Sequence, residues 1–193
     1  MLSRRHLLAS GLATVLAPLT PPLASALAHT RKRSKTFEVA DKFKPQIVVF
    51  TGYAPGTVVV DPRNHFLYLV VGFGFARRYG VGVGRAGLVF KGDAVIGRKA
   101  KWPSWRPTKN MIRRSPGKYA RYAGGMRGGP GNPLGARALY LYRGNRDTMY
   151  RIHGTNQPRS IGRSVSNGCI RMINDHVIDL YDRVEVGAQV VVI

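Results

Sequence analysis

Cysteine and acidic side chains are scarce in this chain of 193 residues, which has one cysteine and nine Asp and Glu residues. One cysteine excludes an intramolecular disulfide. It also leaves a metal site without its usual ligands, because His65, His153 and His176 are scattered along the sequence. The apolar stretch near the start contains Pro18 and is shorter than the roughly 20 residues needed to span a bilayer. Residues 80–84 (Gly-Val-Gly-Val-Gly) lack the helix and acidic residue of a dinucleotide site. We therefore expect no metal, no cofactor and no stable membrane span.

Positive charge is in large excess, with 31 Lys and Arg residues and a formal net charge of +22 at pH 7. A field of this size attracts polyanions from a distance. For an exported protein, the expected partners are the anionic cell wall and lipid headgroups, and nucleic acid is not expected. The charge itself specifies no chemistry.

Residues 1–28 are typical of an export signal, because Arg4 and Arg5 precede an apolar run that is followed by small residues. The candidate cleavage sites lie after Ala26 and Ala28. The Ser-Arg-Arg-x-Leu-Leu pattern favours twin-arginine export to the periplasm. An ordinary secretory signal that contains two arginines is the alternative.

The rest of the chain is expected to form a basic flexible linker, residues 29–46, and one mainly β domain, residues 47–193. The linker is either a tether to the wall or only a solubilising segment. In the domain, β-branched and aromatic runs at 57–60 and 65–71 flank turn residues at 61–64 and predict a hairpin. Glycine and proline are frequent and no long segment has helical periodicity, which favours a β-rich fold.

Residues 101–135 differ from this pattern because glycine and proline are concentrated there. Loops of this length inside a compact domain are usually functional or disordered. We interpret this one as a flexible loop that lines a substrate site, with Trp102 and Trp105 as apolar walls; a structureless insertion is the alternative. Further along, Asn174 is the expected N-cap of a short helix over 175–183.

Cys169 needs a role other than a disulfide, and His153 lies upstream of it at the end of a strand-like run. A cationic or imidazole neighbour lowers the pKa of a thiol from about 8.5 to about 3.5–7.5 and so raises the thiolate fraction. His153 would accept the thiol proton and later pass it to a leaving amine. We therefore predict a nucleophile–base pair; a small buried hydrophobe and a core histidine are the alternatives.

The neighbours of Cys169 fit the same chemistry. Gly168 allows the backbone to approach a substrate closely, and the amides around Gly168 and Cys169 could then face a developing oxyanion. Arg171 lies two residues beyond Cys169, so in an extended segment both side chains point to one face, where the guanidinium could bind a carboxylate. No acidic residue lies between His153 and Arg171, so a backbone carbonyl is a candidate to orient the imidazole.

Three segments together resemble the signature of bacterial L,D-transpeptidases with the YkuD catalytic domain. They are residues 153–156 (His-Gly-Thr-Asn), 160–162 (Ser-Ile-Gly) and 166–172 (Ser-Asn-Gly-Cys-Ile-Arg-Met). Residues 102–107 and 128–141 are similar to the periplasmic ErfK/YbiS/YcfS/YnhG branch of that family. The resemblance extends over roughly residues 47–193.

The resemblance implies a YkuD-type β-sandwich with mixed sheets, in which Cys169 is the nucleophile and His153 the general base. Asn156 and Ser166, which belong to the matching motifs, are implied to bind substrate. The implied substrate is the tetrapeptide stem of peptidoglycan, which is attacked at its third residue with release of D-alanine. The thioester then passes to an amine of another stem, giving a 3→3 cross-link, or to an amine of an envelope protein, which is anchored to the wall.

One residue departs from the family pattern, because many members have histidine where this chain has Asn167. His153 is therefore the base that the motif provides. Two alternatives to transpeptidation stay open. One is hydrolysis of the same thioester, as in an L,D-carboxypeptidase, and the other is a basic wall-binding protein without catalysis.

Overall fold

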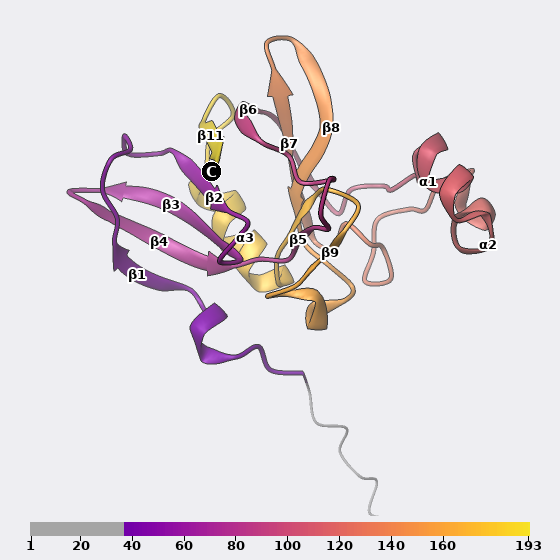
Figure 1. Cartoon of the computed structure of the whole chain (residues 1–193), viewed down its shortest axis with the longest axis horizontal. Coiled ribbons are helices and arrows are strands. Elements are labelled where there is room, and N and C mark those ends of the chain that lie inside the picture. Colours follow the sequence, from indigo (N-terminus) through magenta and orange to yellow (C-terminus); the bar gives the residue numbers. More distant parts are fainter. Residues whose placement is uncertain (1–36) are drawn as a thin grey trace, which may run out of the picture. The chain divides into compact units, whose positions relative to one another are not determined.

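Residues 37–193 are the described part of the computed structural model, and Figure 1 traces their course. The predicted export signal, residues 1–28, and the first part of the predicted linker, residues 29–36, lie outside the described residues. Within residues 37–193, no helix is both long enough and apolar enough to cross a membrane.

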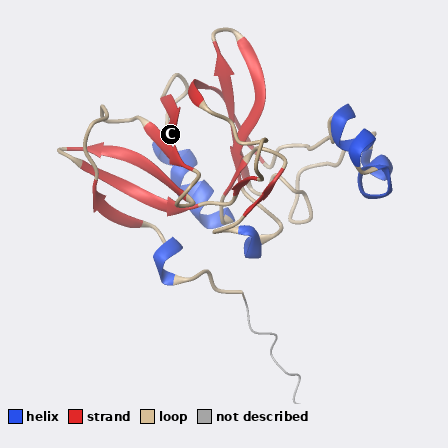
Figure 2. Ribbon diagram, viewed as in Figure 1, coloured by secondary structure: helices blue, strands red, loops and turns tan. Residues whose placement is uncertain are grey.

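Strands predominate in the fold, as Figure 2 shows. Nine of them form one mixed sheet, and the predicted β-rich class with mixed sheets is confirmed. Its strands follow the order β1-β4-β3-β2-β11-β6-β7-β8-β10, and β5 pairs with β9 in a second sheet. The pairs β2–β11, β8–β10 and β5–β9 are parallel. The strands are β1 (Gln46–Val49), β2 (Val58–Asp61), β3 (Phe66–Gly72), β4 (Phe75–Gly80), β5 (Val83–Gly84), β6 (Gly92–Lys101), β7 (Arg137–Arg143), β8 (Arg146–His153), β9 (Ser164–Ser166), β10 (Ile170–Arg171) and β11 (Gln189–Val192). The helices are α1 (Lys109–Arg114), α2 (Pro116–Tyr119) and α3 (Asn174–Arg183), with 3-10 turns η1 (Asp41–Phe43), η2 (Ala120–Tyr122) and η3 (Pro158–Ser160).

The hairpin predicted around residues 61–64 is confirmed by the antiparallel pairing of β2 with β3. Asp61 holds its turn, because its Oδ1 accepts from the backbone N–H groups of Arg63 and Asn64 at 3.0 and 3.1 Å. Asp side chains commonly fix turns by bonding to the backbone a few residues ahead.

Strand β11 joins the two halves of the large sheet, since it pairs in parallel with β2 and antiparallel with β6. Val190 and Val192 of β11 enter the core together with Val58 and Val60 of β2. Val58, Val59 and Val60 have no exposed surface. Strand β2 is therefore covered on both faces, as a continuous run of valines indicates.

The sequence predicts that the domain begins at Ile47, but residues before Ile47 already pack against it. The turn η1 ends at Phe43, whose ring centroid lies 5.7 Å from that of Phe66. A Cβ at Gly80 or Gly162 would come within 2.4 and 2.5 Å of Phe43, so both glycines leave room for this ring. The last residues of the predicted linker are thus packed as part of the domain.

The short helix predicted after Cys169 is confirmed by α3, but the N-cap role predicted for Asn174 is wrong. The N-cap position is Ile173, and Asn174 is the first helical residue. Its Oδ1 instead accepts from the backbone N–H groups of Ala136 and Thr155, at 3.1 and 3.2 Å. Ala136 directly precedes β7 and Thr155 follows β8. Asn174 therefore pins the ends of two strands to the helix.

The segment between β6 and β7, residues 102–136, differs from the predicted flexible loop because it contains α1, α2 and η2. Thr108 caps α1 by accepting from the backbone N–H of Met111 at 3.2 Å, and Pro116 begins α2. Figure 1 shows these short helices standing apart from the strands. The buried amide of Asn132 closes the segment by donating to three of its backbone carbonyls.

Replacing Asn174 with alanine removes the acceptor of both backbone N–H groups. We expect this variant to lower the free energy of unfolding by about 1–3 kcal/mol, because the two donors stay buried without a partner. Asn174→Asp keeps an oxygen in the same place and should lose much less. Urea denaturation followed by circular dichroism measures both variants. Equal losses in the two would contradict this role of the side-chain oxygen.

Candidate active site

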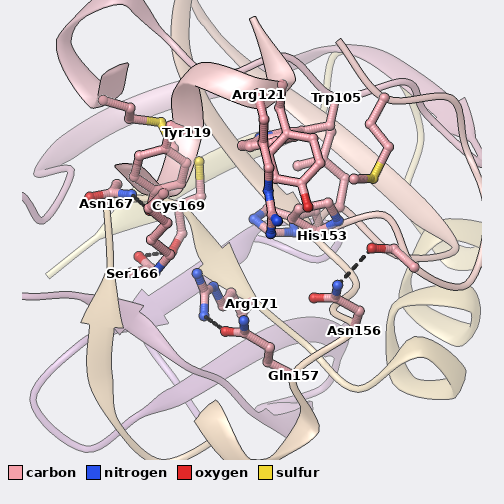
Figure 3. A pocket seen from close by; sticks show the side chains of 17 residues that line it. Trp105, Tyr119, Arg121, His153, Asn156, Gln157, Ser166, Asn167, Cys169 and Arg171 are labelled. Atoms are coloured by element: carbon pink, nitrogen blue, oxygen red, sulfur yellow. Dashed lines mark hydrogen bonds between the residues drawn. The ribbon is translucent and has the colours of Figure 1, made fainter. Parts of the chain in front are cut away.

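Two neighbouring strands bring the predicted nucleophile and base into one pocket. Strand β10 pairs in parallel with β8, with Ile170 opposite Ile152 and Arg171 opposite His153. Cys169 directly precedes β10, and His153 is the last residue of β8. Both residues line a pocket of about 260 Å³, which Figure 3 shows from close by.

A backbone carbonyl orients His153. The residue is 4% exposed, and its Nδ1 lies 2.5 Å from the carbonyl oxygen of Gly154. Because a carbonyl oxygen only accepts, Nδ1 carries the ring proton and Nε2 is the unprotonated nitrogen. The carbonyl thus has the orienting role that a carboxylate has in many nucleophile–base pairs.

Burial sets the resting charge of both residues. It lowers the pKa of His153 to about 3, and the positive charge of Arg171 acts in the same direction. Burial also raises the pKa of the Cys169 thiol, although Arg151 and Arg171 oppose this change. The resting pair is therefore a thiol and a neutral imidazole. The lowered thiol pKa expected from the sequence is not found, because desolvation of the thiolate outweighs its cationic neighbours.

Ser166 fixes the turn that carries Cys169. It is 1% exposed, and its Oγ donates to the carbonyl of Cys169 at 2.6 Å and accepts from the N–H of Gly168 at 3.0 Å. The hydroxyl and the Gly168 N–H therefore bond within the turn. Ser166 also lines the pocket, and the substrate-binding and oxyanion roles of Ser166 and Gly168 stay predictions.

Gly168 is needed for a different reason from the predicted approach of a substrate. Its φ is +125°, in a region that favours glycine. A Cβ at this position would lie 2.5 Å from the ring of Tyr150 and 2.7 Å from the carbonyl oxygen of Leu88. The residue before the thiol is thus enclosed by the protein itself.

Arg171 lies in the pocket as a cation without a carboxylate. Its Nη1 donates to Oε1 of Gln157 at 3.2 Å, as Figure 3 shows. Within residues 37–193, no Asp or Glu forms an ion pair with it. Burial lowers the pKa of this guanidinium. A partly buried cation with a neutral amide as its partner favours an anionic ligand.

Four further pocket residues come from α2 and η2 and were missed by the sequence analysis: Lys118, Tyr119, Arg121 and Tyr122. The charged residues that line the pocket are Lys118, Arg121 and Arg171, and all three are basic. The available signal was the mixed basic and aromatic run at 118–122 (Lys-Tyr-Ala-Arg-Tyr). The sequence alone did not show that α2 and η2 place this run at the pocket.

Asn167 and Asn156 connect the 102–136 segment to the body of the domain. Asn167 donates from Nδ2 to the hydroxyl of Tyr119 at 3.2 Å, and its Oδ1 accepts from Arg85 at 2.9 Å. Asn156, which lines the pocket as the sequence predicts, donates from Nδ2 to the carbonyl of Gly131 at 2.7 Å. The wall of the pocket is thus attached on two sides.

The two tryptophans have different positions. Trp105 lines the pocket and packs against Tyr119 and Tyr122, with ring centroids 6.3 and 5.9 Å apart. Trp102 is 47% exposed and does not line the pocket, so the structure does not bring it together with the other predicted site residues. It is the first residue of the 102–136 segment, and its backbone N–H donates to the carbonyl of Ala136, the last residue, at 2.8 Å.

The family model of the YkuD L,D-transpeptidase catalytic domain matches residues 55–193. Among curated proteins, the chain is 38% identical over 115 residues to "Probable L,D-transpeptidase ErfK/SrfK" of Escherichia coli. This match covers 58% of the chain and 36% of that protein, so the chain spans little more than a third of the relative's length.

Two solved structures are similar. A crystal structure described as a "Probable carnitine operon oxidoreductase caia" from Brucella melitensis is 60% identical, with a TM-score of 0.56, and the match covers 80% of this chain and 96% of that one. L,D-transpeptidase 3 from Mycobacterium tuberculosis is 17% identical with a TM-score of 0.52, over 71% of this chain and 60% of that one. The second likeness shows a shared fold.

The low pKa of His153 predicts that the protein loses stability as the pH falls below about 6.5. The unfolded chain, with the ordinary pKa of 6.5, takes up a proton there, whereas the buried imidazole stays neutral down to about pH 3. In this window the free energy of unfolding should fall by up to about 1.4 kcal/mol per pH unit. Thermal unfolding at a series of pH values measures the slope.

His153→Gln should flatten this pH dependence. His176, whose pKa burial also lowers, is present in both proteins, so the difference between their slopes reports His153 alone. An unchanged slope in the variant would contradict a buried neutral imidazole at this position.

Proposed function

Because the chain belongs to the YkuD family of L,D-transpeptidase catalytic domains, we propose that it is a cysteine acyltransferase acting on the peptide stems of peptidoglycan. The observation that carries this proposal is a single pocket that holds a thiol, a neutral imidazole and a cation without a carboxylate partner. These are the parts needed for nucleophilic attack on the carbonyl of an anionic peptide.

In the first half-reaction, Sγ of Cys169 attacks the carbonyl carbon of the third stem residue while Nε2 of His153 accepts the thiol proton. Both groups are neutral at rest, so the proton moves together with the attack. The tetrahedral intermediate then loses the C–N bond to D-alanine, and His153 returns the proton to the leaving amine. A thioester between Cys169 and the stem remains.

In the second half-reaction, an acceptor amine attacks the thioester and gives its proton to His153. The sulfur leaves and recovers that proton, which restores the thiol. During both steps, the backbone N–H of Cys169 is our candidate oxyanion donor, because Ser166 already accepts the N–H of Gly168. One such donor lowers the barrier by about 2.7–4 kcal/mol.

The stem carries carboxylates, and we propose that Arg171 binds one of them while Trp105 and Asn156 contact the peptide. This pairing also affects the base. The positive charge of Arg171 lowers the pKa of His153, and a bound carboxylate offsets that charge. Substrate binding would therefore make the imidazole a stronger base when it is needed.

The proposed setting is the periplasm, reached through a twin-arginine signal in residues 1–28. The net charge of +22 favours attraction to the anionic wall. The acceptor amine would belong to a second stem or to an envelope protein. Both acceptors react with the same thioester.

The similar Brucella protein is described as a probable oxidoreductase. For the present chain we favour acyl transfer, because the pocket combines Cys169 and His153 with a basic lining. A carbonyl substrate with a nearby carboxylate uses all of these groups.

Incubating the purified protein with tetrapeptide muropeptides should give cross-linked dimers and free D-alanine, and Cys169→Ser should give neither. Mass spectrometry of the products and of the intact protein measures turnover and the thioester. Tripeptide monomers without dimers would identify water as the acceptor, and hence a carboxypeptidase. No products and no added mass would contradict an acyltransferase.

Arg171→Lys tests the proposed carboxylate contact. Lysine keeps the charge but not the planar fork, so we expect kcat/KM for tetrapeptide stems to fall by about tenfold, mainly through KM. The control is Arg163→Lys, an exposed arginine nearby, which should behave like the wild type. Steady-state release of D-alanine provides both parameters. Wild-type kinetics in Arg171→Lys would remove this role.

A further inference from the structure

Arg151 is a buried cation that the proposed reaction leaves without a role. The residue is 9% exposed, and its guanidinium forms a bidentate ion pair with Asp147 at 2.6 and 2.8 Å. The same guanidinium lies over the ring of Tyr140, 4.2 Å from the centroid. A cation buried to this extent is tolerated only when its partners hold it in good geometry.

Asp147 also holds the backbone beside Arg151. Its Oδ1 accepts from the backbone N–H of Met149 at 2.7 Å. Met149 has a φ of +65°, which residues other than glycine rarely adopt. The pairing of β7 with β8 shifts its register between Tyr140 and Tyr142, next to this residue. One carboxylate thus fixes both the guanidinium and an irregular stretch of β8.

This irregular stretch faces the sulfur of Cys169. The carbonyl oxygen of Met149 accepts from Sγ at 4.0 Å. The backbone N–H and the charge of Arg151 both lower the pKa of the thiol, in opposition to burial, which raises it. Strained backbone held in place by its surroundings tends to occur at functional sites. The contact to the sulfur and this effect on its pKa come from the two residues that Asp147 fixes.

Charged and titratable groups act on the thiol or line the pocket that holds it. They are Asp147, Arg151 and His153 of β8, Arg171 of β10, and Lys118, Tyr119, Arg121 and Tyr122 of α2 and η2. Burial has the largest effect and raises the pKa of Cys169, the charges of Arg151 and Arg171 lower it, and the charge of Asp147 raises it. Arg151 and Asp147 therefore act on the sulfur in opposite directions.

We propose that the Asp147–Arg151 pair is a positioning unit for the thiol. It holds Met149 and Arg151 against the sulfur, and its cation stabilises the negative charge that the sulfur acquires on losing its proton to His153. This role rests on the proposed use of Cys169 as the nucleophile. Neither residue of the pair touches the substrate, so both act through Cys169.

The rate of Cys169 alkylation by iodoacetamide, followed by intact mass over a range of pH, reports the thiolate directly. Arg151→Gln removes the cation and should move the midpoint of the rate profile to higher pH, with alkylation near pH 7 slower by about five- to tenfold. Asp147→Asn keeps an oxygen for the Met149 N–H but removes the opposing charge, so its midpoint should move to lower pH. General loosening of the fold would move both variants the same way.

The matched control is Asp179→Asn, which removes a carboxylate paired with Arg77 and Arg183. Its alkylation profile should match the wild type. Shifts in the same direction for Arg151→Gln and Asp147→Asn, or midpoints equal to the control, would overturn the inference. If Arg151→Gln does not fold, Arg151→Lys takes its place. Lysine keeps the positive charge but not the bidentate guanidinium, so the midpoint of alkylation should stay near that of the wild type while turnover of stems falls. Unchanged turnover of stems would also overturn the inference.

Alkylation of Arg151→Gln and Asp147→Asn needs no stem peptide, so with these two variants the two proposals fail separately. Opposite shifts without any turnover of stems would support the positioning role and contradict the proposed function. Turnover of stems together with unshifted midpoints would support the proposed function and contradict the positioning role.

Discussion

The candidate site depends on the parallel pairing of two-residue strand β10 with β8. Arg171 is held on both sides of β10, because its N–H and carbonyl exchange bonds with Gly82 at 2.7 and 2.9 Å, and the N–H of the next residue, Met172, donates to the carbonyl of His153 at 2.8 Å. A slip of one residue would turn the side chains of β10 to the opposite face. Cys169, which enters the strand, would then lose its place beside the end of β8. Backbone bonds thus hold Cys169 and His153 at the same pocket.

Local patterns identified the features of the fold and site that depend on nearby residues. The hairpin around 61–64 and the helix after Cys169 follow from motifs within a few residues. The shared pocket of His153 and Cys169 follows from the signature segments over residues 153–172. The errors concern contacts between distant segments. Asn174 has the composition of an N-cap, but its amide is taken by strands that are distant in sequence. Strand β6 was not predicted from the sequence, because Gly97 and the charged residues of the strand interrupt any apolar run.

The same limit applies to the electrostatics. The sequence shows that Cys169 has basic neighbours, and from these alone a low thiol pKa is expected. Burial raises that pKa instead, and burial is a property of the packed molecule. The partners of the few acidic residues are also known only from the fold. Asp61 accepts a hydrogen bond within a turn, and Asp147 and Asp179 form ion pairs with Arg151 and Arg77. With carboxylates used in this way, the pocket keeps a basic lining that is open to an anionic substrate.

The central position of β11 has a consequence for how the domain folds. Val58 pairs with Val190, so this ladder closes a loop of about 130 residues before its contacts contribute. Pairing over such separations makes folding slow. Until β11 inserts, β2 and β6 present unpaired edges, and the edge of β2 is rich in valine. A second molecule can add to such an edge, so the interval before closure is when this chain is most exposed to aggregation.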